Sequence, residues 1–127
     1  MSAQNIVLFV FLCCGAFAMP AHAEQQFPDV LKAQVRATGE NTFNFDVTIS
    51  SPYDTPARYA DAFHVKTLSG EILGERILWH DHQHEQPFTR DLYGVTIPAE
   101  IKTVEIQARD QRYGYGGAAI QVALPGR

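Results

Sequence analysis

Short segments in which hydrophobic and polar residues alternate run through most of this chain, and they limit the folds that it can adopt. The clearest is TFNFDVTIS (42–50), in which every second residue is aromatic or β-branched. A period of two with such residues is typical of a strand that buries one face. KTVEIQARD (102–110) alternates in the same way. The pattern therefore predicts strands, and no segment shows the sustained period of an amphipathic helix.

Weaker extended segments separate the turn signals along the rest of the chain. They are expected at 30–37, 62–68, 71–79, 88–97 and 118–125. Gly74 predicts a bulge or a break within its segment, and RYGYGG (112–117) is interpreted as a connection. About seven short strands predict an all-β fold, an antiparallel β-sandwich of the immunoglobulin or fibronectin type. An up-and-down barrel is the alternative.

Several residues of these segments are expected to form the core of the sandwich. Phe63 is the expected large central aromatic. The other expected core residues are Val47, Val65, Ile106 and Val122.

The first 23 residues have the pattern of a secretory signal peptide. Residues 6–18, IVLFVFLCCGAFA, are apolar and uncharged, but a membrane span needs ~20 such residues. Ala21 and Ala23 follow, so we expect cleavage after Ala23. The preceding MSAQN lacks Lys and Arg, and an uncleaved membrane anchor is the alternative. The remaining 24–127 would be a single periplasmic or secreted β-sandwich domain.

Both cysteines lie inside this apolar run. Leu12 and Cys13 precede the two candidates for lipid attachment, Cys13 and Cys14, and neither is the small residue expected at that position. We therefore expect no lipid anchor. The mature domain would contain no disulfide and no thiolate metal site, so its core must hold it together.

The charges favour a soluble domain without nucleic acid or membrane partners. The chain carries 14 acidic and 10 basic residues, a formal net charge of −4. They are mixed along the sequence, with no basic stripe for nucleic acid. The sequence contains no cationic amphipathic helix, so we expect no membrane insertion after signal cleavage.

Three histidines in alternate positions stand out in WHDHQHEQPFTR (79–90). In a strand, side chains two residues apart lie ~6.6–6.8 Å apart on one face. Two imidazoles at that spacing, His80 and His82, can bind one copper or zinc ion. The candidate third ligands are His84, Glu85 and, from another strand, His64. An exposed polar loop and a pH sensor with ordinary histidine pKa values near ~6.5 are the alternatives.

Two further segments suggest partner binding. In EQPFTR (85–90), Phe88 is expected to fill the core, and Arg90 either binds an anion or pairs with an acidic neighbour such as Glu85. RDQRYGYGG (109–117) lies at an expected hairpin tip, where sandwiches often carry binding surfaces. Its candidate partner-binding residues are Arg109, Arg112, Tyr113 and Tyr115. In the alternative reading, its tyrosines cover the end of the core.

No catalytic motif is present, so we do not expect an enzyme. The sequence lacks G-x-S-x-G, H-E-x-x-H, a phosphate loop and a dinucleotide fingerprint. The predicted function is a periplasmic binding or accessory module for another periplasmic or envelope protein. The alternative is a copper- or zinc-binding protein that uses His80 and His82.

The stretch HDHQHEQPFTRDLYGVTIP, with GEILGER before it and VEIQARDQRYGYGG after it, carries a resemblance. It resembles a group of small exported bacterial immunoglobulin-like proteins of unassigned function with an H-x-H-x-x-E-Q-P-F-T-R core. The resemblance covers roughly residues 43–117. His80, His82 and residues 85–90 match the core, whereas His84 does not. It implies the fold and export, and it implies no activity.

Overall fold

The structure is a computed structural model that describes residues 25–127. The predicted signal peptide and its cleavage site lie outside these residues. Strands, turns and loops make up the described part, and it contains no helix. The strands are β1 (Asp29–Ala37), β2 (Thr42–Ser50), β3 (Ala60–Thr67), β4 (Ile72–Ile77), β5 (Phe88–Thr96), β6 (Thr103–Asp110), β7 (Gly114–Tyr115) and β8 (Ile120–Ala123).

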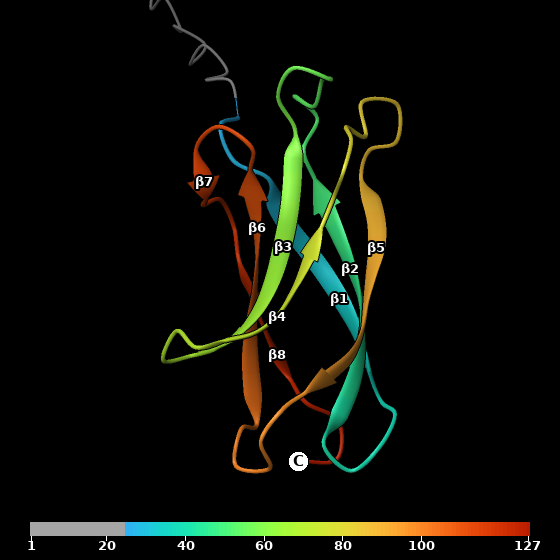
Figure 1. Cartoon of the computed structure of the whole chain (residues 1–127), viewed down its shortest axis with the longest axis vertical. Helices are drawn as coiled ribbons and strands as arrows, with labels where there is room; N and C mark the ends of the chain where they lie inside the picture. The colour runs from blue at the N-terminus through green and yellow to red at the C-terminus, as the bar shows by residue number, and fades with distance from the viewer. Residues whose placement is uncertain (1–24) are drawn as a thin grey trace, which may run out of the picture.

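These strands form two antiparallel sheets, which confirms the predicted β-sandwich (Figure 1). One sheet has the order β1-β2-β5, and the other has the order β4-β3-β6. β7 and β8 both pair with β6, β7 near its end and β8 near its start. In immunoglobulin constant domains the fourth strand joins the sheet of the first. Here β4 pairs with β3 instead.

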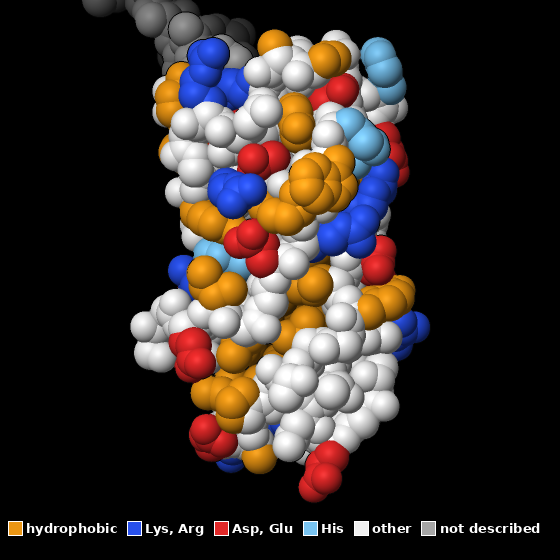
Figure 2. Space-filling model, viewed as in Figure 1, with side chains coloured by type: hydrophobic (Ala, Val, Ile, Leu, Met, Phe, Trp, Pro, Cys, Tyr) orange, Lys and Arg blue, Asp and Glu red, His pale blue; other side chains and the backbone are white. Residues whose placement is uncertain are grey.

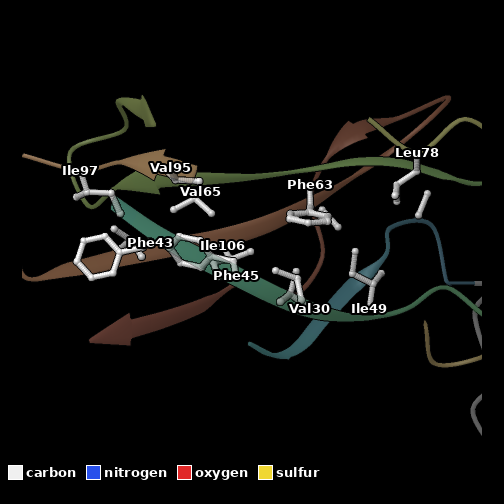
Figure 3. Packing of buried hydrophobic residues seen from close by; sticks show 14 of the residues in the cluster. Val30, Phe43, Phe45, Ile49, Phe63, Val65, Leu78, Val95, Ile97 and Ile106 are labelled. Carbon is white, nitrogen blue, oxygen red and sulfur yellow. The ribbon is translucent and has the colours of Figure 1, made fainter. Parts of the chain in front are cut away.

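The core lies between the two sheets (Figure 3). The four inward residues of β2 are all buried, as their alternation predicts: Phe43, Phe45, Val47 and Ile49. Phe63 faces them from β3 and is 0% exposed. The other expected core residues are also found there, Val65 and Ile106 fully buried and Val122 partly buried against the cluster. A domain without cysteine is thus held by this single hydrophobic cluster.

Gly74 lies at an irregularity of the β3–β4 pairing, as predicted. Val65 faces Gly74, and the register then shifts before Lys66. A Cβ atom at Gly74 would lie 3.2 Å from Leu92 and 3.3 Å from Val95 of β5. Glycine therefore allows β4 to approach the edge strand of the other sheet closely.

The segment 112–117, interpreted as a connection, contains the short strand β7. Three loops lie together at one end of the sandwich, and the described chain also enters there (Figure 1). We call this the loop end. It comprises the connections 51–59, 78–87 and 111–113. Within residues 25–127, no helix is long and apolar enough to cross a membrane.

Candidate functional site

Gln86 connects two loops of the loop end, 51–59 and 78–87, by hydrogen bonds. Its Oε1 accepts a hydrogen bond from the backbone N–H of Ser51 at 2.7 Å. Its Nε2 donates to the backbone oxygen of His82 at 3.1 Å and contacts the Ser51 hydroxyl at 3.2 Å. One amide side chain therefore satisfies polar groups on both loops.

Asp54 provides a second connection between the same loops. Its carboxylate is buried and accepts hydrogen bonds from the backbone N–H groups of Ala60 at 3.0 Å and His82 at 3.1 Å. Burial raises the pKa of Asp54, although these hydrogen bonds oppose the shift. No sequence pattern indicates this role, because an Asp between two prolines is typical of an ordinary loop.

His82 is a packed residue of the loop end. Its side chain is 6% exposed, and its ring stacks on Phe88 with centroids 3.9 Å apart and planes at 10°. Its Nδ1 is buried and has no hydrogen-bond partner among the described residues. The pKa of His82 is lowered, chiefly by burial and then by Arg90 and His80. Its imidazole is therefore neutral in the folded domain near neutral pH.

His80 lies beside His82 but on the surface. The two ring centroids are 5.1 Å apart, with planes inclined at 40°. Nδ1 of His80 is 3.0 Å from the backbone oxygen of Asp81. His84, two residues further along, is exposed. The structure thus brings together the two histidines that the spacing singled out.

Glu85 and Arg90 form an ion pair, as one of the two sequence interpretations proposed. The guanidinium donates to both carboxylate oxygens, at 3.2 Å and 2.9 Å. The pKa of Glu85 is lowered, mainly by the hydrogen bond from Arg90. Phe88 is 1% exposed and fills the core as expected. Arg90 is therefore paired within the domain, and its role in partner binding stays a prediction.

His64 is not part of the histidine pair. It lies on β3, is 5% exposed, and stacks on Tyr115 with ring centroids 3.8 Å apart. Neither ring nitrogen has a hydrogen-bond partner within 25–127. In the described part of the chain, no three His, Cys, Asp or Glu side chains are placed to hold a metal ion. The predicted three-ligand site with His64, His84 or Glu85 is therefore not formed.

The 109–117 segment is only partly a surface patch. Arg109 pairs with Asp61 at 2.7 Å, and the hydroxyl of Tyr115 donates to Glu75 at 2.7 Å. Burial and this bond raise the pKa of Tyr115. Arg109 and Tyr115 are thus bonded within their own sheet, and their role in partner binding stays a prediction. Arg112 and Tyr113 remain exposed, the latter by 48%.

Asp110 organises the tip of that segment. It is 1% exposed and accepts hydrogen bonds from the Tyr53 hydroxyl at 2.6 Å and from the backbone N–H groups of Arg112 and Tyr113 at 2.8 Å. Arg58 pairs with it at 3.2 Å. Burial alone would raise the pKa of Asp110, but these donors outweigh it and lower the pKa. The buried carboxylate of Asp110 is therefore held in position by its donors and has a structural role.

Trp79 is another residue of the loop end that no sequence motif marks. The side chain is 83% exposed, although it follows the buried Leu78. The Tyr59 hydroxyl lies 3.4 Å from its backbone oxygen. Figure 2 shows hydrophobic side chains beside basic and histidine side chains towards the loop end. Trp79 lines a small hollow together with Arg76, His80 and Arg90.

Comparison with known proteins finds a relative of similar sequence. A protein of Halomicrobium mukohataei named "Putative lipoprotein" is 35% identical over 94 residues. The alignment covers 74% of this chain and 46% of the relative, so the chain spans about half of that protein's length. No protein-family model matches the chain. No solved structure matches it significantly either.

Proposed function

We propose that this protein is an exported β-sandwich module that binds another protein of the cell envelope or the exterior through its loop end. The observation that carries the proposal is the exposure of Trp79. Tryptophan is usually highly buried, because leaving an indole in water is unfavourable. A single tryptophan that is 83% exposed on a well-tied loop is therefore a good candidate for an interface anchor.

The surroundings of Trp79 support this role. Interface hot spots are enriched in tryptophan, tyrosine and arginine. Arg76 and Arg90 lie beside the indole, and each is held in place by an acidic partner, Asp91 or Glu85. Because these side chains are already ordered, a partner would lose little side-chain entropy in binding them.

Export is proposed from the N-terminal sequence together with the relative. The apolar residues 6–18 and the small residues before Glu24 fit a signal peptide. The name of the Halomicrobium relative also supports an envelope protein. We propose release after Ala23 rather than lipid attachment, since Leu12 and Cys13 are unsuited to the position before a modified cysteine. Mass spectrometry of the exported protein distinguishes the two by the N-terminal residue and any attached lipid.

We also propose that the protein acts by binding rather than by catalysis. Several polar side chains at the loop end make structural bonds. Gln86 and Asp54 join loops, and Glu85 is paired with Arg90. Binding a partner requires an exposed surface, and it does not require a reactive side chain.

Photo-crosslinking tests the proposed interface. Trp79 would be replaced by a photoreactive phenylalanine analogue in cells of the native organism. The matched control is Leu68, which is 57% exposed and lies in the turn between β3 and β4. We expect a defined protein adduct from position 79 that is absent from position 68. Equal adducts at both positions, or none at position 79, would contradict the proposal.

A further inference from the structure

The histidine pair at the loop end has the separation of two ligands on one ion. We propose that His80 and His82 together bind a single divalent copper ion, with water completing the coordination. This proposal is independent of the protein partner and of Trp79 as an interface anchor.

The distance between the rings is the first support. A metal–nitrogen bond is ~2.0–2.1 Å long, so the centroids of two imidazoles in adjacent positions on one ion lie about 4.5–5 Å apart, from tetragonal to tetrahedral geometry. The observed separation of His80 and His82 is 5.1 Å. The two rings are therefore close enough to bind the same ion.

The second support is the fixed position of His82. Its backbone N–H donates to Asp54, its carbonyl accepts from Gln86, and its ring stacks on Phe88. A ligand held in this way loses little conformational freedom when an ion binds.

The third support is the hydrogen bond of His80. Its Nδ1 lies 3.0 Å from the carbonyl oxygen of Asp81, which can only accept a hydrogen bond. Nδ1 therefore carries the proton in the neutral ring, and Nε2 keeps its lone pair. Metal-binding histidines typically donate their other N–H to a carbonyl or carboxylate in this manner.

The room around the pair suits an open site. A hollow of about 380 Å³ is lined by residues 80–85 and by Arg90. Glu85 forms an ion pair with Arg90, and within residues 25–127 no third protein ligand is positioned beside the two histidines. Water must therefore fill the other positions, which gives an exchangeable ion. Among divalent ions at a nitrogen site, copper binds most tightly.

Trp79 provides a built-in reporter for the test. It is the single tryptophan of the chain and directly precedes His80. The untagged mature protein would be titrated with copper(II) chloride at near-neutral pH while tryptophan emission is followed. We expect quenching that saturates at one equivalent. Electron paramagnetic resonance of the copper complex should show two imidazole nitrogens.

Three variants separate this pair from the rest of the loop. His80→Ala should weaken copper binding by at least about tenfold. His82→Phe should do the same while keeping a ring to stack on Phe88, and its unfolding curve verifies that it folds. The matched control is His84→Ala, which removes an exposed imidazole of the same loop. This control should leave the affinity unchanged within about threefold.

Three results would overturn the proposal. One is an equal loss of affinity in His84→Ala and His80→Ala, which would mean loose binding by the whole loop. Another is undiminished binding in a folded His82→Phe protein. The last is the absence of quenching and of a bound copper signal up to about 100 µM copper, since that excludes a dissociation constant in the micromolar range.

Discussion

The imidazole of His82 lies parallel to the ring of Phe88, with centroids 3.9 Å apart and planes at 10°. This stack joins a residue of the histidine-rich loop to the start of β5 and to the core. Because Nδ1 of His82 is also buried without a partner among the described residues, the ring contributes as a flat packing surface rather than as a hydrogen-bonding group.

Two substitutions at His82 should therefore differ in their effect on the stability of the domain. His82→Ala removes the stack and leaves a cavity over Phe88, and we expect a loss of about 2–3 kcal/mol in the free energy of unfolding. His82→Phe keeps the stack and removes the unpartnered nitrogen, so its stability should equal or exceed that of the parent. Urea denaturation of the three proteins measures both effects. Equal destabilisation by Ala and Phe would show that the imidazole nitrogens matter more than the stack.

Gln86→Ala should destabilise the domain by about 2–3 kcal/mol. The substitution leaves the buried backbone N–H of Ser51 without its acceptor, and a buried unpaired polar group costs about 1–3 kcal/mol. It also removes the bond to the carbonyl of His82. The control is Gln83→Ala in the same loop, whose exposed side chain should contribute less than about 0.5 kcal/mol. Hydrogen exchange at the Ser51 amide should accelerate in Gln86→Ala alone.

The buried His64 should make the domain less stable in mild acid. Its pKa is lowered below the ordinary 6.5, chiefly by burial and then by Lys66, while Glu75 and Glu105 act in the opposite direction. The unfolded chain therefore takes up a proton at a higher pH than the folded one. Between the unfolded and the folded pKa, stability must fall as the pH falls.

His64→Phe is the variant that isolates this contribution. Phenylalanine keeps an aromatic ring against Tyr115 and cannot be protonated. We expect its free energy of unfolding to decline less steeply than that of the parent below pH 6.5. The pKa of His82 is lowered as well, so some dependence should remain. Denaturation at several pH values gives the slopes, and identical slopes would remove His64 from the explanation.

Asp110→Asn should cost about 2–4 kcal/mol at neutral pH, because a buried carboxylate with four donors is replaced by an amide. Its pKa is lowered in the folded state. The stabilisation is therefore complete above the ordinary value of 3.8 and is lost as the pH falls through the folded pKa. The difference between parent and variant should narrow in strong acid.

A partly exposed ion pair supplies the comparison for Asp110. Glu105 pairs with Lys66 at 3.4 Å on the outer face of the sheet. Glu105→Gln should change the free energy of unfolding by less than about 1 kcal/mol, because water screens such pairs. A loss as large as that of Asp110→Asn would show that burial is not the deciding factor.

The strands and the core were predictable from the sequence because the alternation of hydrophobic residues indicates directly which side chains are buried. Phe43 and Phe45 recur at a period of two, and a strand with that pattern can only bury one face. Gly74 likewise marked its own irregularity, since glycine weakens regular pairing wherever it stands. The Glu85–Arg90 ion pair could also be predicted, because the two residues lie close together in the chain.

The partners of the polar residues were decided by the tertiary structure alone. Gln86 meets Ser51 across 35 residues, and Asp54 meets the amide of His82 across 28. Such contacts depend on strand order and register, which a local pattern does not encode. The same reason explains why the sequence grouped His64 with His80 and His82, whereas the fold stacked it on Tyr115. The alternation determined which side chains are buried, and the packing of the two sheets decided what each polar side chain touches.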